Sequence, residues 1–235
     1  MFIVAPDLAA ASRACDVWAQ DCPTGEKCMP HGANGGGGWE HTRCSPLADV
    51  PNAVGEPCSV VGSFNSGLDD CALGSMCWDV DPYTNMGECV GFCHGSEAQP
   101  LCEDPCTHCS IFADGTRILC LPECDPVAQD CSEGQGCYPS DGNFACLPDA
   151  SGTEGAIGDP CEFLNVCNAG NFCADAEIVP ACEGRGCCAP FCDPAGPDPC
   201  PGLLLATTCV PWYAPGQDPG LCSNQSAIGA CVLSP

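Results

Sequence analysis

A cysteine frame that occurs twice constrains this chain more than any other feature of its sequence. Residues 124–137 read CDPVAQDCSEGQGC, and residues 15–28 read CDVWAQDCPTGEKC. In both copies six residues separate the first two cysteines and five separate the next two. Ala-Gln-Asp precedes the second cysteine, and a glycine follows it by three residues. Such a match indicates an internal duplication.

Cysteines must supply the stability that the apolar residues of this chain cannot. Leu, Val, Ile and Phe make up only 41 of 235 residues, and the net charge is −26, a combination that normally predicts disorder. The 28 cysteines suffice for fourteen disulfides, each typically contributing about 2–4 kcal/mol. We therefore predict that nearly all are paired in a small disulfide-rich fold. It would consist of tandem cystine-stapled modules of short β-hairpins and loops, with little helix and an elongated shape.

The duplication extends over three successive segments, called A, B and C. They occupy 15–46, 55–93 and 93–122 in the first repeat, and 124–148, 158–192 and 192–211 in the second. In both repeats segment A closes on Cys-x-Pro, and segment B closes on Cys-x-x-Phe-Cys. The expected organisation is an N-terminal segment (1–14), a first A-B-C repeat (15–123) and a second A-B-C repeat (124–235).

The spacing also predicts how the framework is bridged. We expect one pairing pattern for the cysteines of the two A segments, which are Cys15, Cys22, Cys28, Cys44 and Cys124, Cys131, Cys137, Cys146. Cutting the chain between Cys120 and Cys124 leaves 13 cysteines before the cut and 15 after it, so full pairing requires a bridge across the cut. The element Cys-x-x-Gly-x-x-Cys begins at 22, 71, 131 and 167, and its glycine predicts a turn with positive φ.

The disulfide density and the charge limit the location and the partners. Disulfides persist in oxidising compartments, so we expect a secreted or cell-surface protein. Residues 1–7 have no basic region and too short an apolar run for a signal peptide, and we interpret Met1 as the start of a truncated chain. Five basic residues against 31 acidic ones argue against nucleic acid as a partner, and no apolar run is long enough for a membrane span. The expected partner is therefore an unknown protein, a surface glycan or a second copy of the chain.

Several motifs permit a chemical interpretation beside the disulfide one. Cys102, Cys106 and Cys109 have the spacing of an iron–sulfur motif, and a zinc-ribbon spacing links the last two with Cys120 and Cys124. Both would need reduced thiols, so we favour disulfides. His31 and His41 flank a glycine run and could converge on a metal, although an exposed loop is the simpler interpretation.

Another basic residue, Arg185, lies within a short cysteine-bounded loop, as in some protease inhibitors; an ordinary exposed loop is the simpler interpretation.

Acidic residues recur in register after the third cysteine of segment B. Carboxylates lie two and four residues beyond Cys77 and Cys173, and Ca²⁺ prefers such oxygen ligands on constrained loops. The candidate ligands are Asp79, Asp81, Asn85 and Glu88 in the first repeat, and Asp175 and Glu177 in the second. A solvated acidic loop is the alternative. The sequence predicts no other cofactor and no catalytic residue.

The stretches CDVWAQDCPTGEKC, SMCWDVDPYTNMG, CDPVAQDCSEGQGCYPS and GDPCEFLNVC together resemble a family of secreted cysteine-rich proteins of bacteria. Members of that family often carry the label ribulose-phosphate epimerase, an activity that the resemblance therefore implies. That enzyme class needs the apolar strands of a (β/α)₈ barrel, for which this composition is too poor. The spacing is also similar, more distantly, to Dickkopf-like and knottin-like cystine modules. The expected function is non-enzymatic binding or adhesion, with an epimerase or a protease inhibitor as alternatives.

Overall fold

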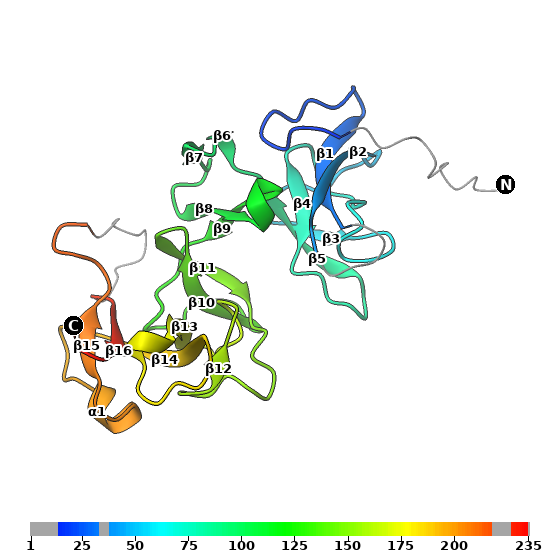
Figure 1. Cartoon of the computed structure of the whole chain (residues 1–235). Helices are drawn as coiled ribbons and strands as arrows, with labels where there is room; N and C mark the ends of the chain where they lie inside the picture. The colour runs from blue at the N-terminus through cyan, green and yellow to red at the C-terminus, as the bar shows by residue number, and fades with distance from the viewer. Residues whose placement is uncertain (1–13, 33–37, 218–226, 235) are drawn as a thin grey trace. The chain divides into compact units, whose positions relative to one another are not determined.

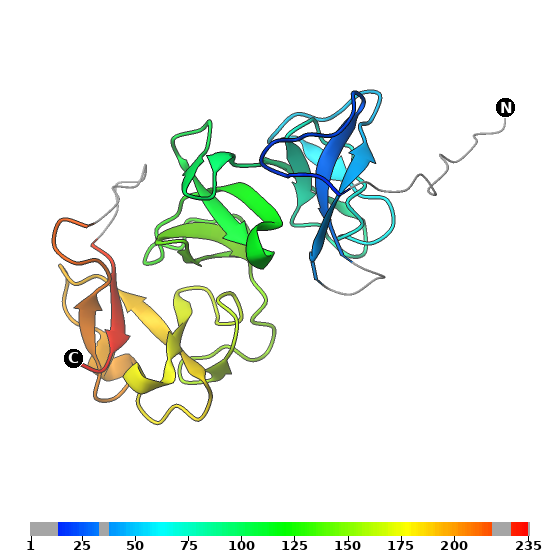
Figure 2. The ribbon, with the colours of Figure 1, turned by 45° about the horizontal axis from the view of Figure 1, so that its top comes forward.

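The structure, a computed structural model, describes residues 14–32, 38–217 and 227–234. Within these ranges the regular structure consists of short antiparallel strands in small separate sheets, with two 3-10 turns and one helix of four residues (Figures 1 and 2). The scarcity of apolar residues explains this, because no strand can bury enough surface to support a large sheet. The predicted fold class, tandem disulfide-rich modules of hairpins and loops, is confirmed.

The first repeat contains nine strands and the 3-10 turn η1 (Ala113–Gly115). The strands are β1 (Glu26–His31), β2 (His41–Pro46), β3 (Pro57–Ser59), β4 (Ser75–Trp78), β5 (Met86–Gly91), β6 (His94–Ser96), β7 (Gln99–Leu101), β8 (Thr107–Phe112) and β9 (Arg117–Pro122). They form the sheets β1-β2, β3-β5-β4, β6-β7 and β8-β9.

The second repeat contains seven strands, the 3-10 turn η2 (Ala176–Ile178) and the helix α1 (Cys200–Leu203). The strands are β10 (Gln135–Ser140), β11 (Asn143–Pro148), β12 (Pro160–Cys161), β13 (Asn171–Asp175), β14 (Gly186–Cys192), β15 (Thr208–Pro211) and β16 (Gly229–Val232). Strands β10 and β11 form a hairpin, while β14 pairs with β12, β13 and β16, and β16 also pairs with β15.

The disulfides follow one rule in all six segments once Cys106, the Cys182–Cys187 pair and Cys222 are set aside. Of the four cysteines that then remain in each segment, the first bonds to the third and the second to the fourth. In the A segments the bridges are Cys15–Cys28, Cys22–Cys44, Cys124–Cys137 and Cys131–Cys146, so the predicted repetition is confirmed. In the B segments they are Cys58–Cys77, Cys71–Cys89, Cys161–Cys173 and Cys167–Cys188. In the C segments they are Cys93–Cys109, Cys102–Cys120, Cys192–Cys209 and Cys200–Cys231.

Hairpin register explains this rule. The third and fourth cysteines face each other across an antiparallel pair of strands, as in Cys28 opposite Cys44 and Cys137 opposite Cys146. The same register holds in both B segments and in the second C segment. Each of these two cysteines bonds back to the stretch of chain that precedes the paired strands, so a module is a pair of strands with the preceding stretch fastened across it at two points.

The bridges correct one boundary of the sequence analysis. The second C segment was expected to end at Cys209, by analogy between Cys209-Val-Pro and Cys120-Leu-Pro. Cys209 is instead the third cysteine of that segment, bonded to Cys192, and the fourth is Cys231. The expectation was wrong because Cys-x-Pro follows the third cysteine here and the fourth cysteine in the first repeat.

One further disulfide and one further bonded cysteine do not belong to the paired bridges of the six segments. Cys182–Cys187 closes a loop with a sequence separation of five. Cys106 is also disulfide-bonded, and every other described cysteine of its repeat is paired within that repeat. The bridge across the 120/124 cut stays a prediction.

The residues that recur around the cysteines have structural roles. The glycine of each Cys-x-x-Gly-x-x-Cys element has positive φ as predicted, at Gly25, Gly74, Gly134 and Gly170. Positive φ also occurs at both residues of the Asp141-Gly142 turn, as a tight hairpin between β10 and β11 requires.

The Ala-Gln-Asp motif holds the first loop of segment A against its hairpin. The Gln20 side chain accepts a hydrogen bond from Cys28 N at 3.0 Å, and Asp21 Oδ1 accepts one from Asp16 N at 2.9 Å. In the second repeat Gln129 and Asp130 make the same two bonds, at 3.1 and 2.9 Å. The duplicated motif therefore builds the scaffold.

Contacts divide the chain into two compact units, and each is described by itself. Unit 1 comprises the residues up to Cys102 together with Cys109–Cys120, and unit 2 comprises Glu103–His108 together with the residues from Leu121 onward.

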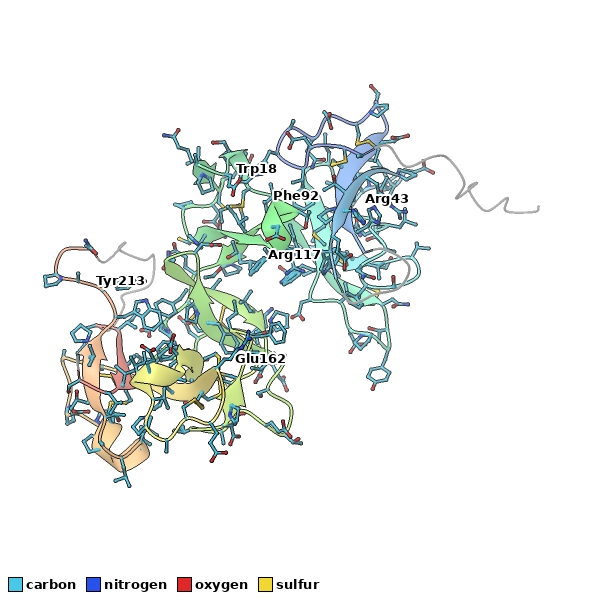
Figure 3. All side chains as sticks on the ribbon, viewed as in Figure 1. Trp18, Arg43, Phe92, Arg117, Glu162 and Tyr213 are labelled. Carbon is cyan, nitrogen blue, oxygen red and sulfur yellow. A yellow bond between two sulfur atoms is a disulfide. The ribbon has the colours of Figure 1, made fainter. Side chains whose placement is uncertain are left out.

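In unit 1 a cation, Arg117, joins segments A, B and C by packing on three aromatic rings. Figure 3 marks the position of Arg117. Arg117 Cζ lies 5.4 Å from the ring centroid of Trp39, 4.7 Å from that of Trp78 and 4.8 Å from that of Phe112. Burial lowers the pKa of Arg117 to about 10. Cation–π attraction offsets part of the cost of removing this charge from water.

Unit 2 has an aromatic cluster in place of that cation. Phe172 stacks on Phe191 at 4.8 Å between centroids, and Trp212 packs edge-on against Phe172 at 5.1 Å. Phe144 packs against both Phe191 and Trp212. The cluster joins rings from segments A, B and C of the second repeat and forms part of the apolar core of unit 2.

The two repeats also use different chemistry where segment A meets segment B. In unit 1 the buried Lys27 Nζ donates to Asp69 Oδ1 at 2.5 Å and to the carbonyl oxygens of Cys71 and Ser75. In unit 2 the frame places Gly136 at the position of Lys27. Tyr138 instead donates from its hydroxyl to the carbonyl of Cys167, the counterpart of Cys71, at 2.8 Å.

The buried ion pair of unit 1 yields a stability prediction. Replacing Lys27 by Met leaves the Asp69 carboxylate buried without its cation, which costs about 3–5 kcal/mol. Amide exchange of Cys77, whose N–H bonds Asp69 Oδ2, should therefore accelerate by about 100-fold or more. The double variant Lys27→Met, Asp69→Asn removes the unpaired charge and should recover most of this loss. Slow exchange in the single variant, or no recovery in the double one, would contradict the assignment.

Candidate functional site

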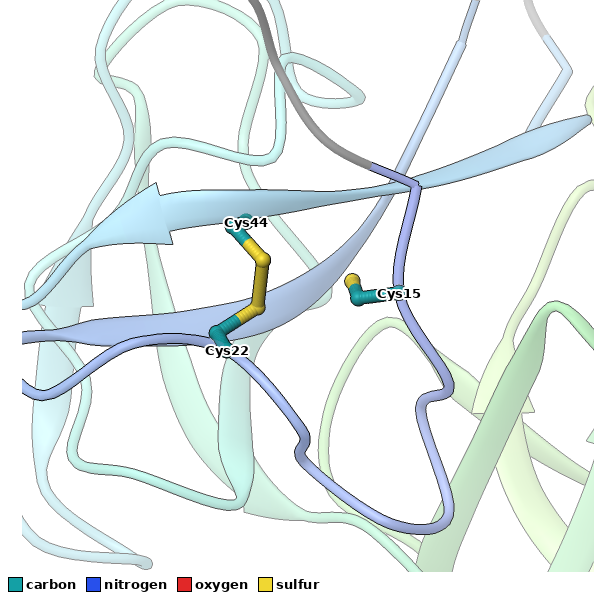
Figure 4. Close-up of side chains that lie close together, drawn as sticks. All are labelled: Cys15, Cys22 and Cys44. Atoms are coloured by element: carbon teal, nitrogen blue, oxygen red, sulfur yellow. A yellow bond between two sulfur atoms is a disulfide. The ribbon is translucent and has the colours of Figure 1, made fainter.

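Groups of three cysteine sulfurs in at least five segments have the compactness of a metal site, with ligand atoms within 4.8 Å of one another. One is formed by Cys15, Cys22 and Cys44, where Figure 4 shows the Cys22–Cys44 bond beside the Cys15 sulfur. Cys15 is itself bonded to Cys28. These groups are pairs of adjacent disulfides, and a sulfur in a disulfide is no thiolate ligand. The cysteines of the iron–sulfur and zinc spacings are likewise disulfide-bonded.

The first acidic loop, between β4 and β5, is organised by Asp81. Its Oδ1 accepts hydrogen bonds from Tyr83 N at 2.9 Å, Thr84 N at 2.8 Å and the Thr84 hydroxyl at 3.0 Å. The loop closes on two backbone bonds, from Asp81 N to Met86 O and from Asn85 N to Asp81 O. Asp81 therefore shapes the loop, as an Asx-turn residue does. The Thr84 and Tyr83 N–H groups hold the pKa of its carboxyl below the ordinary value.

The other predicted calcium ligands of this loop are exposed. Asp79 and Asn85 have positive φ, and Glu88 lies on β5 opposite Trp78. At the tip of the loop Tyr83 is 94% exposed. The hydrogen bonds of Asp81 thus fix the backbone of an exposed tyrosine within an acidic loop, a feature that the sequence analysis did not identify.

The second acidic pair is placed differently. Asp175 ends β13, and its Oδ1 accepts a hydrogen bond from Glu177 N at 2.9 Å, so that it caps η2. Glu177 lies within η2 and is exposed. The two pairs share sequence positions, but a wide turned loop follows Asp79, whereas a 3-10 turn follows Asp175.

The two histidines beside the glycine run do converge. His31 and His41 pair at the end of β1 and β2, with ring centroids 5.7 Å apart. Burial lowers the pKa of His31, and its Nδ1 lies 3.1 Å from Gly32 O. The rings are thus anchored on strand ends. Most of the glycine run between them lies outside the described residues.

Arg185 lacks a feature that a protease-inhibitor loop requires. Its side chain is exposed in the Cys182–Cys187 loop, but its carbonyl oxygen already accepts a hydrogen bond from Ala176 N at 3.2 Å. The next residue, Gly186, is buried in β14. A protease must place the carbonyl of the residue that it recognises in its oxyanion hole, so this geometry argues against substrate-like inhibition at Arg185.

Unit 2 contains a pocket of about 360 Å³ that the sequence did not predict. Its walls are mainly apolar and include Leu164, Phe172, Ile178, Val210 and Trp212. Asp175 is the one ionisable residue among those that line it. The volume lies within the range of small-ligand sites. No short motif could have indicated this pocket, because its residues come from four separate strands and from the loops between them.

Comparisons of the chain with protein-family models, curated proteins and solved structures found no match. The described residues include no helix that is both long enough and apolar enough to span a membrane. The disulfide density of the fold fits an extracellular protein with a structural or binding role.

The hydrogen bonds of Asp81 yield a prediction about pH. Because they favour the carboxylate, the folded pKa lies below the unfolded one. Their contribution to loop order is therefore complete above the unfolded pKa and is lost as pH falls through the folded pKa. The amide proton shifts of Tyr83 and Thr84, measured by NMR, should titrate with a midpoint below about 3.9. A midpoint at or above that value would show that the carboxylate does not hold the loop.

Proposed function

We propose that this protein is a non-enzymatic binding or structural protein of the extracellular space or the cell envelope. The observation that carries the proposal is the acidic β4–β5 loop, where internal hydrogen bonds fix the backbone of Tyr83 while its side chain is exposed. Exposed aromatic residues on preorganised loops are typical anchors of protein interfaces, because little entropy is lost when they bind. The acidic surroundings favour a partner with a basic rim.

The roles of the recurring residues support this proposal over an enzyme. The cysteines are in disulfides, and the conspicuous Ala-Gln-Asp motif bonds the backbone of its own module. The small separate sheets are also not the (β/α)₈ barrel of a ribulose-phosphate epimerase. Membership of the secreted cysteine-rich family of bacteria, implied by the resemblance, agrees with this function and remains part of the proposal.

The proposal predicts that binding depends on Tyr83. The intact oxidised protein, immobilised and exposed to envelope extract or culture fluid, should retain a partner that Tyr83→Ser retains at least tenfold more weakly. Val50→Ser is the control, since Val50 is 84% exposed but lies in the linker before segment B. Equal retention by both variants would contradict a role for the loop. Turnover in an isomerase or hydrolase screen that is lost on reduction would instead favour an enzyme.

Calcium is proposed as a ligand of the same loop. Three hydrogen bonds engage Oδ1 of Asp81, so a cation would use its second oxygen together with Asp79, Asn85 and Glu88. We expect a dissociation constant of about 10⁻⁴ to 10⁻³ M by calorimetry at constant ionic strength. Asp79→Asn should weaken binding about tenfold without removing the Asp81 bonds. Asp175→Asn is the matched control, because it removes the same charge from the other acidic pair. Equal weak heats in all three proteins would show that the negative surface attracts calcium without a specific site.

A further inference from the structure

Two residues that line the unit 2 pocket correspond to residues of unit 1 that pack on the Arg117 guanidinium. Counting from the cysteines, Ala174 corresponds to Trp78, and Trp212 corresponds to Phe112. Ile228 stands where unit 1 has Arg117, three residues before the fourth cysteine of segment C. Unit 1 thus places a guanidinium over the rings of Trp78 and Phe112.

Unit 2 retains part of that environment but not its cation. Ala174 and Trp212 both line the pocket, and alanine in place of tryptophan leaves room between them. Ile228 is buried, and its carbonyl accepts a hydrogen bond from Trp212 N at 2.9 Å, which keeps the two residues paired as neighbours. The second repeat therefore lacks the arginine side chain of the first, and aromatic and aliphatic side chains line an open pocket that includes Trp212, the backbone neighbour of Ile228.

The charge at the pocket favours a cationic ligand, the kind of group that unit 1 supplies with Arg117. Asp175 corresponds to Asp79 and is the one ionisable residue that lines the pocket, so the pocket has no cation of its own. One Asp175 oxygen accepts a hydrogen bond from Glu177 N, and the carboxylate has further acceptor positions. Among the described basic residues, only Arg185 is exposed. Few basic side chains of the protein itself are therefore available to pair with Asp175 in place of a cationic ligand.

We propose that the unit 2 pocket binds an arginine side chain presented by a peptide segment of a partner protein. The guanidinium fits because it is flat, is weakly hydrated for a cation, packs on aromatic rings and forms a forked pair with a carboxylate. Its aliphatic stem matches the apolar walls. This inference concerns unit 2 alone and does not rest on the Tyr83 loop of unit 1.

The test compares two peptides that differ only in charge. The probes are N-acetyl-Gly-Leu-Arg-Leu-Gly-amide and the same peptide with citrulline, which replaces the guanidinium by a neutral urea of the same shape. Binding to the intact oxidised protein is measured by calorimetry and by NMR shifts of residues around the pocket. We expect the arginine peptide to bind at least tenfold more tightly and to shift the indole signal of Trp212.

Two protein variants separate the pocket from the general acidity of the surface. Asp175→Asn should reduce the preference for arginine over citrulline about tenfold, whereas Glu177→Gln, which removes the same charge two residues away, should leave it unchanged. Ala174→Trp, which copies the residue of unit 1, should abolish binding by filling the space. Equal binding of the two peptides, equal effects of the two charge variants, or no binding at millimolar peptide would overturn the proposal.

Discussion

Two disulfides that cross each other in every segment are the constraint on which the rest of this structure depends. In five of the segments the third and fourth framework cysteines face each other across paired strands, so their bonds to the preceding stretch of chain lie side by side and form a small apolar nucleus. In segment B of the first repeat this nucleus consists of Cys58, Val60, Cys71, Cys77 and Cys89. Each framework bond closes a loop with a sequence separation of 12 to 31, which restricts the unfolded chain wherever the apolar core is too small.

Because the sulfur nuclei fix the backbone of each module, the contacts between modules are free to differ. The first repeat joins segments A and B through Lys27 and Asp69, whereas the second uses the hydroxyl of Tyr138 for the corresponding carbonyl. The buried ion pair is weak evidence for extra stability, since the cost of removing both charges from water offsets their attraction. The cysteine frame is compatible with either contact, because each contact joins segment A to segment B.

The sequence predicted the parts of the structure that depend on local spacing. Equal cysteine intervals with equal turn glycines gave the modules, the hairpins and the repeated bridges of the A segments. Prediction failed at Cys209, where the intervals diverge and a short local motif was matched to the wrong cysteine.

The environments of Lys27 and Arg117 and the unit 2 pocket were missed for a different reason. Each depends on side chains from separate modules, and cysteine spacing within one module carries no information about its neighbour. The two acidic pairs occupy corresponding sequence positions, but their roles in the structure differ. Asp81 organises a loop, and Asp175 caps a 3-10 turn at the edge of the pocket.

The difference between the two repeats indicates where function can reside in such a scaffold. Residues bound to the cystine frame, such as Gln20 and Gln129, are alike because any change would break the same backbone bonds. Residues between modules bear no such constraint, and there Trp78 and Arg117 of one repeat correspond to Ala174 and Ile228 of the other. A duplicated cystine scaffold can therefore keep one inter-module site filled as a structural contact and leave its counterpart open to a ligand. Specificity then resides in a few substitutions beside the nuclei, while stability resides in the cysteines.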